Sequence, residues 1–216
     1  MGQKVNPQAL RTGPVYDWAS RWFEKAHYKD VLLEDYKLRK ILMERLKIAG
    51  VSRIEIDRSI NSIKITAFVS RPGIVIGRAG TGLEDLKKFL VTTMHSFSKM
   101  ARVLPKMDIR IEPIKEPNLD AFLVAKNIAD QLLKRLSYKR VMLQSAEKVM
   151  GAGAKGVRIV MSGRINGAEI GRREKTQRGT VPLSTIRERI HFASVPALTK
   201  KGFIGIKVWI NEPEKK

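Results

Sequence analysis

Two glycines, Gly77 and Gly80, lie three residues apart between an apolar turn and an amphipathic helical pattern. Glycine has no Cβ, so the backbone of such a loop lets a nucleic-acid strand approach closely. The following helix points its unpaired N–H groups and the positive end of its dipole at the same place, and Arg78 adds a cation between the glycines. We therefore predict that this loop binds RNA phosphates through Gly77, Arg78, Ala79 and Gly80.

Two other glycine motifs of nucleotide-binding proteins do not fit this chain. A P-loop requires Gly-x4-Gly-Lys-Ser/Thr, but Gly82 is followed by Leu83 and Glu84. The run 151–156 matches GxGxxG, yet it follows a helical pattern and precedes a strand, which reverses the order of the dinucleotide motif. We interpret this run as a helix C-cap and turn.

The composition favours a polyanionic partner. The 216 residues include 42 Lys and Arg against 21 Asp and Glu, a formal net charge of +21. Nucleic acid is the first candidate; an anionic membrane is the second, but the cations are spread along the chain instead of lining one amphipathic helix. No apolar run approaches the roughly 18 residues of a membrane span, and the first residues lack the apolar core of a signal peptide. We therefore expect a cytoplasmic protein with no membrane partner.

Cysteine and histidine usage argues against metal sites. The chain has no Cys, which excludes disulfides and Cys-based zinc sites and fits a reducing compartment. Its three histidines, His27, His95 and His191, are far apart in sequence and form no metal-binding pair or Ser-His-Asp arrangement. We expect no cofactor and no bound metal.

The hydrophobic periodicity predicts two α+β domains, residues 1–116 and residues 117–216, joined at the proline-flanked stretch 113–117. After an irregular N-terminal extension, the first domain has the order α-β-β-α-α-β, which is that of a type II KH domain. KH domains use a GxxG loop to clamp about four nucleotides. The expected helices and strands of this domain are 29–49, 53–57, 63–70, 81–100 and 107–111.

The second domain is predicted to contain two helices followed by an antiparallel sheet. Asn118 can cap the first helix, with Asp120 in its first turn. Its apolar face is expected to include Ala121, Ala125, Ile128, Ala129, Leu132, Leu133 and Leu136. The second helix and the β segments are expected at 137–150, 157–161, 163–179, 185–193 and 205–210.

Two basic segments lie in this domain. Four cations within seven residues straddle the connection between its helices: Lys134, Arg135, Lys139 and Arg140. The other segment is the glycine-rich ribbon 164–179, within a stretch from residue 153 to residue 191 that has nine basic and three acidic residues. Each segment could be a solvated face or a charged sheet edge, but in a chain of this net charge we favour contact with RNA phosphates. Nothing near the helix junction indicates base-specific readout, so backbone binding is expected there.

Five blocks of the sequence resemble the bacterial ribosomal protein S3 family of the small subunit. They occur in the same order as in the family and cover essentially the whole chain: 1–7 (MGQKVNP), 74–80 (IVIGRAG), 153–156 (GAKG), 162–170 (SGRINGAEI) and 202–210 (GFIGIKVWI). A KH loop alone would not distinguish this family from other KH proteins, whereas the five blocks together are specific.

The resemblance implies a non-enzymatic structural constituent of the small ribosomal subunit, which binds rRNA in the subunit head and lines the mRNA channel entrance. The implied partners are small-subunit rRNA, mRNA and ribosomal proteins 10 and 14, with proteins 4 and 5 near the entrance. The mRNA contacts would be Lys134, Arg135, Lys139 and Arg140. The expected rRNA contacts are Lys4, Lys155, Arg158, Arg164, Arg172, Arg173, Lys175 and Arg178.

The family also implies that basic residues on the second helix of the C-terminal domain help to unwind structured mRNA. Lys139 and Arg140 match that pattern. One turn further on, Leu143 and Gln144 stand where many members keep a basic pair. This departure puts the strength of the unwinding role in question.

Two alternatives remain open. A free-standing KH regulator of mRNA would be active without ribosomes, and sedimentation of the native protein with or without small subunits distinguishes the two. An RNA-acting enzyme would need a convergent acid/base or metal set. Glu169 and Glu174 are isolated in the basic ribbon and are expected to pair with arginines instead.

Overall fold

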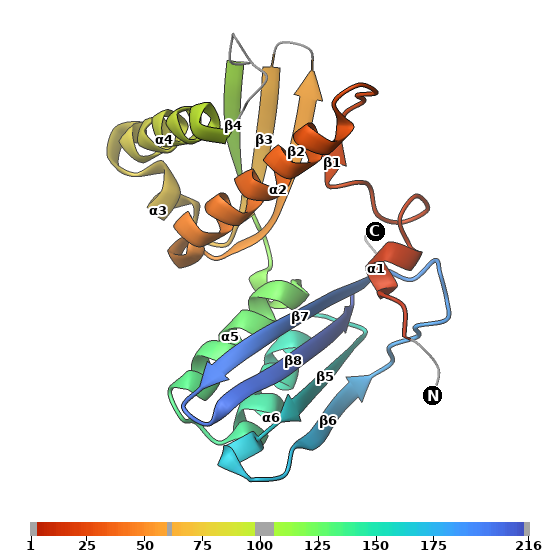
Figure 1. The fold of residues 1–216 in the computed structure, drawn as a ribbon. Helices are drawn as coiled ribbons and strands as arrows, with labels where there is room; N and C mark the ends of the chain where they lie inside the picture. The colour runs from red at the N-terminus through yellow and green to blue at the C-terminus, as the bar shows by residue number, and fades with distance from the viewer. Residues whose placement is uncertain (1–3, 60–61, 98–105, 214–216) are drawn as a thin grey trace. The chain divides into compact units, whose positions relative to one another are not determined.

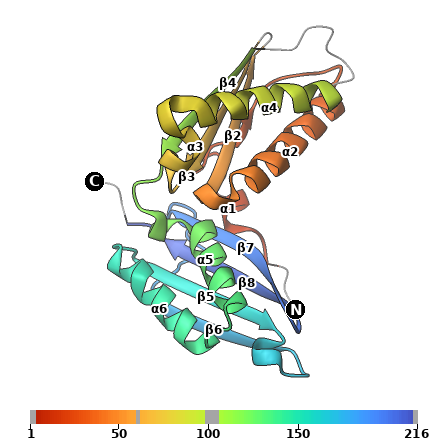
Figure 2. The same cartoon turned by 90° about the vertical axis from the view of Figure 1, so that its left-hand side faces the viewer.

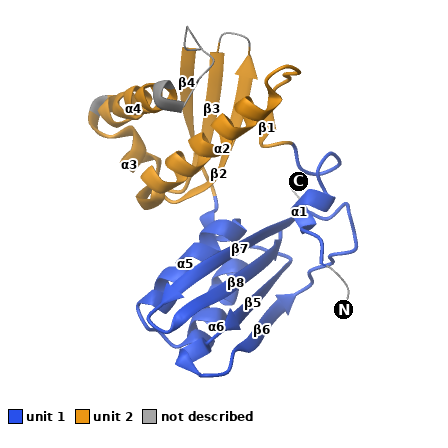
Figure 3. Cartoon of the chain, viewed as in Figure 1, with its two compact units in different colours: residues 1–17, 116–216 blue, residues 18–115 orange. Residues whose placement is uncertain are grey.

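The computed structural model describes residues 4–59, 62–97 and 106–213. The chain forms two compact units, one of residues 18–115 and one of residues 1–17 and 116–216 (Figure 3). The first 17 residues, assigned to the N-terminal domain from sequence, thus group with the C-terminal residues. The expected turn at Asn61 and the expected helix residues 98–100 lie outside the described ranges.

In the unit of residues 18–115, helices cover one face of a sheet with the strand order β1-β2-β3-β4 (Figure 1). Strands β2 and β3 are antiparallel, whereas β1 pairs with β2 and β4 pairs with β3 in parallel. After the short β1, the elements follow in the order α-β-β-α-α-β, which confirms the type II KH fold. Their bounds are Ser20–Arg21 (β1), Tyr28–Arg45 (α2), Val51–Ser59 (β2), Ser62–Val69 (β3), Pro72–Ile76 (α3), Thr81–Phe97 (α4) and Lys106–Pro113 (β4).

The core of this unit follows the predicted periodicity. Leu38 and Leu42 of α2 and Leu86 and Leu90 of α4 are buried, as residues four positions apart on one helix face should be. They pack with alternate apolar residues of β2 and β3 in one cluster. The core therefore holds in place the helices before and after the glycine loop.

A buried carboxylate, Asp35 of α2, fastens the β1 segment to this unit. Trp22 Nε1 donates a hydrogen bond to Asp35 Oδ2 at 2.8 Å, and Ser20 Oγ donates to the same oxygen at 3.1 Å. Arg58 Nε of β2 donates to Oδ1 at 2.7 Å. Because the charge is paired and hydrogen-bonded, its burial is compensated.

In the other unit, helices α5 and α6 lie on one face of an antiparallel sheet with the order β6-β5-β8-β7 (Figure 2). This confirms the expected two helices and antiparallel sheet, although β7 begins at Ile190, five residues later than its predicted start at Thr185. The bounds are Pro7–Leu10 (α1), Ala121–Leu133 (α5), Tyr138–Gly151 (α6), Gly156–Gly163 (β5), Arg172–Gly179 (β6), Ile190–Thr199 (β7) and Gly202–Asn211 (β8).

Both ends of α5 differ from the prediction. Asp120, not Asn118, is the N-cap: its carboxylate accepts hydrogen bonds from the backbone N–H groups two and three residues further on, at 2.9 and 3.0 Å. At the other end, Leu133 and Leu136 were expected on the buried face but are exposed. Leu133 lies about 100° around the helix from buried Leu132, and Leu136 lies beyond the end of the helix, so neither side chain faces the sheet.

Arg11 explains why the first residues belong to this unit. It is fully buried, and its guanidinium donates only to backbone carbonyl oxygens. The acceptors are those of Pro7 (3.0 Å), Pro182 (3.2 Å), Leu183 (3.0 Å), Thr185 (2.8 Å) and Glu188 (2.9 Å). These bonds join the α1 segment to the long connection between β6 and β7, a long-range pairing that sequence spacing does not reveal.

Candidate nucleic-acid interface

The glycine loop adopts backbone conformations that favour glycine. Gly77 has φ +70° and Gly80 has φ +82°, both in the left-handed region. Arg78 between them is exposed, and its carbonyl accepts a hydrogen bond from the Thr81 hydroxyl at 2.9 Å. Helix α4 starts directly after the loop, so its positive dipole end lies beside an exposed cation. The arrangement suits an anionic ligand.

Gly82 positions this loop, and its role was missed from sequence. A Cβ at Gly82 would lie 2.6 Å from the carbonyl oxygen of Val75, which is closer than real Cβ atoms approach backbone. The residues before the loop form the short helix α3, which is the first of the two consecutive helices in the predicted order and for which no bounds were predicted. Glycine at this place lets the first turn of α4 pack against the end of α3. A glycine in the first turn of an otherwise well-patterned helix was the available signal.

The four cations of the helix junction are all exposed. Lys139 and Arg140 lie in the first turn of α6, and this first turn contains no acidic residue. Cations at a helix N-terminus oppose the helix dipole and cost roughly 0.3–1 kcal/mol each. Lys134 is the C-cap of α5, and Arg135 has a left-handed backbone with φ +61°. The helix dipole therefore does not account for the placement of Lys139 and Arg140, whereas it favours Lys134 at the C-terminus of α5.

The register of the sheet divides the ribbon cations between two faces. Val157, Ile159 and Met161 of β5 are buried in the core shared with the two helices. Arg178 and Arg172 of β6 pair with β5 residues that point the same way, so they lie on the helix side. Arg173 and Lys175 lie on the opposite side together with Arg158 of β5, on what we call the outer sheet face.

Several predicted contact residues already have partners within the protein. Lys155 Nζ lies 3.7 Å from Glu188 Oε2, and Arg178 Nη2 lies 3.4 Å from Glu147 Oε1. Arg158 lies over the ring of Trp209, with 5.2 Å between the guanidinium carbon and the ring centroid. Arg164 Nε donates to the Ala168 carbonyl at 2.9 Å, and exposed Lys4 precedes α1. The ribbon thus does not act as one uniform patch.

The outer sheet face contains a cation and a ring that sequence reasoning missed. Lys207 of β8 is exposed and lies opposite Val160, which in turn lies opposite Lys175, so the two lysines flank one buried valine. Phe203, at the start of β8, is exposed on the same face. The alternation of Lys207 with buried Ile206 and Val208 was the available signal. The structure describes strands β5 to β8 in full, and none of their outward-facing residues is acidic.

Comparison with known proteins agrees with both units. A family model described as ribosomal protein S3, C-terminal domain, matches residues 128–210, and a KH domain model matches residues 37–119. The small ribosomal subunit protein uS3 of Carboxydothermus hydrogenoformans is 46% identical over 215 residues, covering 99% of this chain and 93% of the relative. The uS3 proteins of Lactobacillus helveticus (44%; 99% and 92% covered) and Hydrogenovibrio crunogenus (44%; 100% and 91% covered) are similarly related. The chain belongs to the ribosomal protein S3 family.

Members of the ribosomal protein S3 family are structural ribosomal proteins and not enzymes, in agreement with the expectation of a protein that acts by binding. The C-terminal family match begins inside α5 and ends in β8, so it includes the helix junction and the ribbon. The KH match includes the glycine loop. No described helix is long and apolar enough to cross a bilayer, and the described residues contain no group of three metal-ligating side chains.

Proposed function

We propose that this chain is a cytoplasmic RNA-binding constituent of the small ribosomal subunit that binds rRNA of the subunit head through its outer sheet face. The observation that carries this proposal is the charge pattern of that face. Arg173, Lys175 and Lys207 are exposed there, form no ion pair with a described residue, and have no acidic neighbour among the outward-facing strand residues. Such uncompensated cations attract phosphates at long range and release counterions on binding.

The glycine loop is proposed as a second RNA contact. Exposed Arg78 and the N-terminus of α4 suit a phosphate group, and the two left-handed glycines keep side chains out of its way. The proposed partners also include ribosomal proteins 10 and 14 as direct neighbours, and proteins 4 and 5 near the mRNA channel entrance.

The helix junction is proposed to contact mRNA where it enters the subunit. The assignment of Lys139 and Arg140 as mRNA contacts is supported by their unfavourable position at a helix N-terminus. A bound phosphate would offset the repulsion between these cations and the helix dipole. Leu143 and Gln144 are exposed one turn further along α6, so this face carries fewer cations than it could. Any contribution to unwinding would therefore come from holding phosphates and not from base readout.

Two triple variants of the full-length chain test the rRNA proposal. The first replaces the free outer-face cations (Arg173→Ala, Lys175→Ala, Lys207→Ala). The second removes the same charge from ion-paired cations (Lys155→Ala, Arg178→Ala, Arg189→Ala), whose partners lie 3.7, 3.4 and 3.9 Å away. Binding to a transcript of the 3′ domain of the small-subunit rRNA is measured at several salt concentrations.

We expect the outer-face variant to reduce the slope of log affinity against log salt by about 2–3, as the loss of three phosphate contacts requires. The ion-paired variant should change the slope much less. Equal slopes for the two variants would contradict the assignment of the outer sheet face. Sedimentation of the native protein away from small subunits would favour the free-standing regulator instead.

A further inference from the structure

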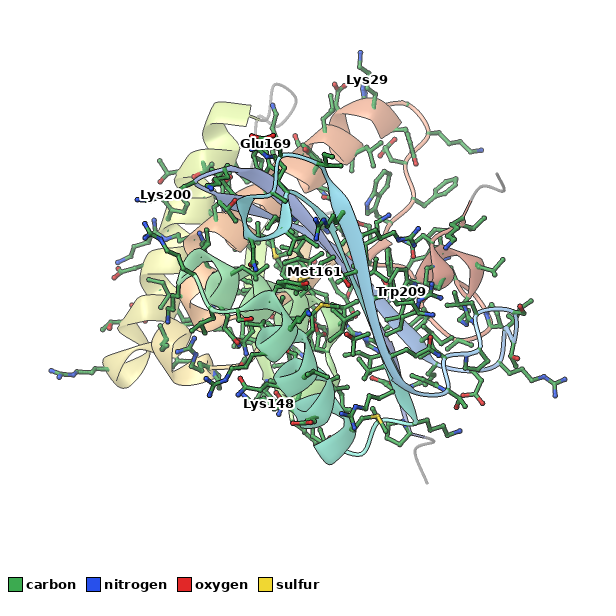
Figure 4. The ribbon with its side chains drawn as sticks, turned by 90° about the horizontal axis from the view of Figure 1, so that it is seen from below. Lys29, Lys148, Met161, Glu169, Lys200 and Trp209 are labelled. Carbon is green, nitrogen blue, oxygen red and sulfur yellow. The ribbon has the colours of Figure 1, made fainter. Side chains whose placement is uncertain are left out.

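One cleft of the C-terminal unit shares Arg135 with the helix junction and Arg164 with the ribbon, and its other lining residues belong to none of the proposed RNA contacts. It has a volume of about 760 Å³ and lies between the α5–α6 connection, the segment after β5 and the β7–β8 turn. Its floor includes the buried side chains of Met161, Ile165 and Ile204. In Figure 4, Met161 lies in the interior of the unit and Lys200, from the rim, lies at the surface.

The walls of the cleft expose large aliphatic side chains. Leu133 is 51% exposed and Leu136 is 46% exposed, and both line the cleft. Leu198, which is 61% exposed, joins the lining from β7, more than sixty residues further along the chain, where it pairs with Phe203 at the border with the outer sheet face. Single exposed leucines are ordinary, but several converging on one concavity mark a binding site.

Four cations surround this apolar surface. Arg135, Arg164, Lys200 and Lys201 line the cleft, and none of its lining residues is acidic. None of the four forms an ion pair with a described residue. The Lys201 side chain lies directly over Gly167, where an added Cβ would be 2.2 Å from its Cδ atom. The cleft therefore presents an apolar interior and a positive rim.

We propose that this cleft binds an acidic, amphipathic segment of a partner protein. Apolar side chains of the segment would fill the leucine-lined interior, and Asp or Glu residues beside them would meet the four rim cations. A second copy of this chain is disfavoured as the occupant because it carries a net charge of +21. The cleft would thus attach a protein neighbour on a surface that borders the outer sheet face at Leu198, which pairs with Phe203.

The same chemistry argues against RNA as the occupant. Single-stranded RNA is held by aromatic platforms on which bases stack, and Tyr138 is the one aromatic side chain among the lining residues. The polar edges of a buried base would also need hydrogen-bond partners. Apart from the cations, Tyr138, Asn166 and Thr199 are the polar side chains that line the cleft. An aliphatic interior is better matched by protein side chains.

Photo-crosslinking in cells tests this proposal, which rests on the proposed assembly into the small subunit. The full-length chain is expressed in bacterial cells with benzoylphenylalanine in place of Leu133, and a matched version has it in place of Leu143, which is exposed on α6 outside the cleft. Cells are irradiated, small subunits are isolated on a gradient, and the adduct is identified by mass spectrometry. Co-sedimentation with the subunit tests the proposed function before any adduct is read.

We expect the probe at Leu133 to react with a protein segment whose apolar residues are flanked by Asp or Glu, and the probe at Leu143 not to react with that segment. Adding Lys200→Glu and Lys201→Glu should reduce the Leu133 adduct by about tenfold or more, since like charges across an interface cost over 1 kcal/mol. Adding Lys115→Glu and Lys148→Glu, two exposed lysines outside the cleft and outside the proposed RNA contacts, should not. An adduct of Leu133 with RNA, no adduct in assembled subunits, or an adduct insensitive to the rim charges would each overturn the proposal.

Discussion

Arg135 and Gly153 occupy equivalent positions: each is the residue directly after the C-cap, Arg135 for helix α5 and Gly153 for helix α6. Their φ angles are +61° and +91°. In each turn this residue donates a hydrogen bond to the carbonyl three residues earlier at 3.0 Å, and the next residue donates to the carbonyl five residues earlier, at 3.3 Å for α5 and 3.4 Å for α6. This is the Schellman geometry, in which glycine is the usual residue. An arginine there bears a conformational cost and places a cation at the rim of the cleft.

Replacing Arg135 with glycine should therefore stabilise the protein. The left-handed conformation costs a non-glycine residue roughly 1–2 kcal/mol, of which the greater freedom of glycine in the unfolded chain offsets part. We expect Arg135→Gly to raise the free energy of unfolding by about 0.5–1 kcal/mol, and Gly153→Ala to lower it by a similar amount. Chemical denaturation measures both. Arg135→Ala, which removes the charge but keeps the strain, is the control, and equal stability of the Ala and Gly variants would contradict the argument.

The glycine loop can be tested by reversing its charge. Arg78→Asp with Ala79→Asp should weaken binding of the full chain to single-stranded RNA, because carboxylates at the N-terminus of α4 would repel phosphates. Circular dichroism should be unchanged, since Arg78 is exposed. The matched control is Lys25→Asp with Ala26→Asp, an exposed dipeptide of the same unit with the same change in charge. If both double variants bind equally well, the loop is not an RNA contact.

RNA binding by the whole chain should depend steeply on salt. About six phosphate contacts predict a slope of log affinity against log salt of roughly −4 to −5. Fluorescence anisotropy with an rRNA fragment at several salt concentrations measures the slope. A nearly constant affinity between low and moderate salt would mean that charge is not the dominant contribution.

The helix junction should affect translation of structured messages. Lys139→Ala with Arg140→Ala should slow passage through a stable mRNA hairpin, because fewer cations would hold the opened strand. Unstructured messages and subunit assembly should be unaffected. Leu143→Lys with Gln144→Lys should speed passage, since both positions are exposed on the same helix. Ribosomes carrying each version, assayed on paired messages with and without the hairpin, give the rates; identical rates on the hairpin message would leave only an rRNA-binding role.

Arg11 should be essential for the packing of the N-terminal residues. Arg11→Met removes the cation that five backbone carbonyls share, and we expect the free energy of unfolding to fall by about 2–4 kcal/mol. Amide hydrogens of the connection between β6 and β7 should exchange faster. Arg21→Met is the control, because its two ion pairs, each 3.4 Å long, lie at the surface and should be worth less than about 1 kcal/mol. Similar losses for the two variants would argue against a fastening role for Arg11.

The sequence by itself determined the class of fold, the GxxG loop, the polyanionic partner and the family. These depend on local properties: the spacing of Leu38 and Leu42 on a helix, the lack of a Cβ at Gly77 and Gly80, and the net charge. Each of these inferences can be made without knowing which segments are in contact in the fold. Helix capping is also a local property, but the sequence predicted Asn118 as the cap of α5 instead of Asp120. Both residue types can cap a helix, and only the backbone geometry shows which of the two does so.

Only the tertiary structure decided which cations are available and which residues share a surface. Strand register separates Arg172 from Arg173 onto opposite faces and places Lys207 on the same face as Lys175, and a one-residue shift would reverse that assignment. Long-range contacts pair Lys155 with Glu188, so a cation that looks free in the sequence is engaged in the fold. The cleft exists because the ends of α5, β5 and β7 converge, and helical spacing alone could not show that the leucines after α5 face it. Local pattern specifies each element, whereas the packing of distant elements specifies the surfaces.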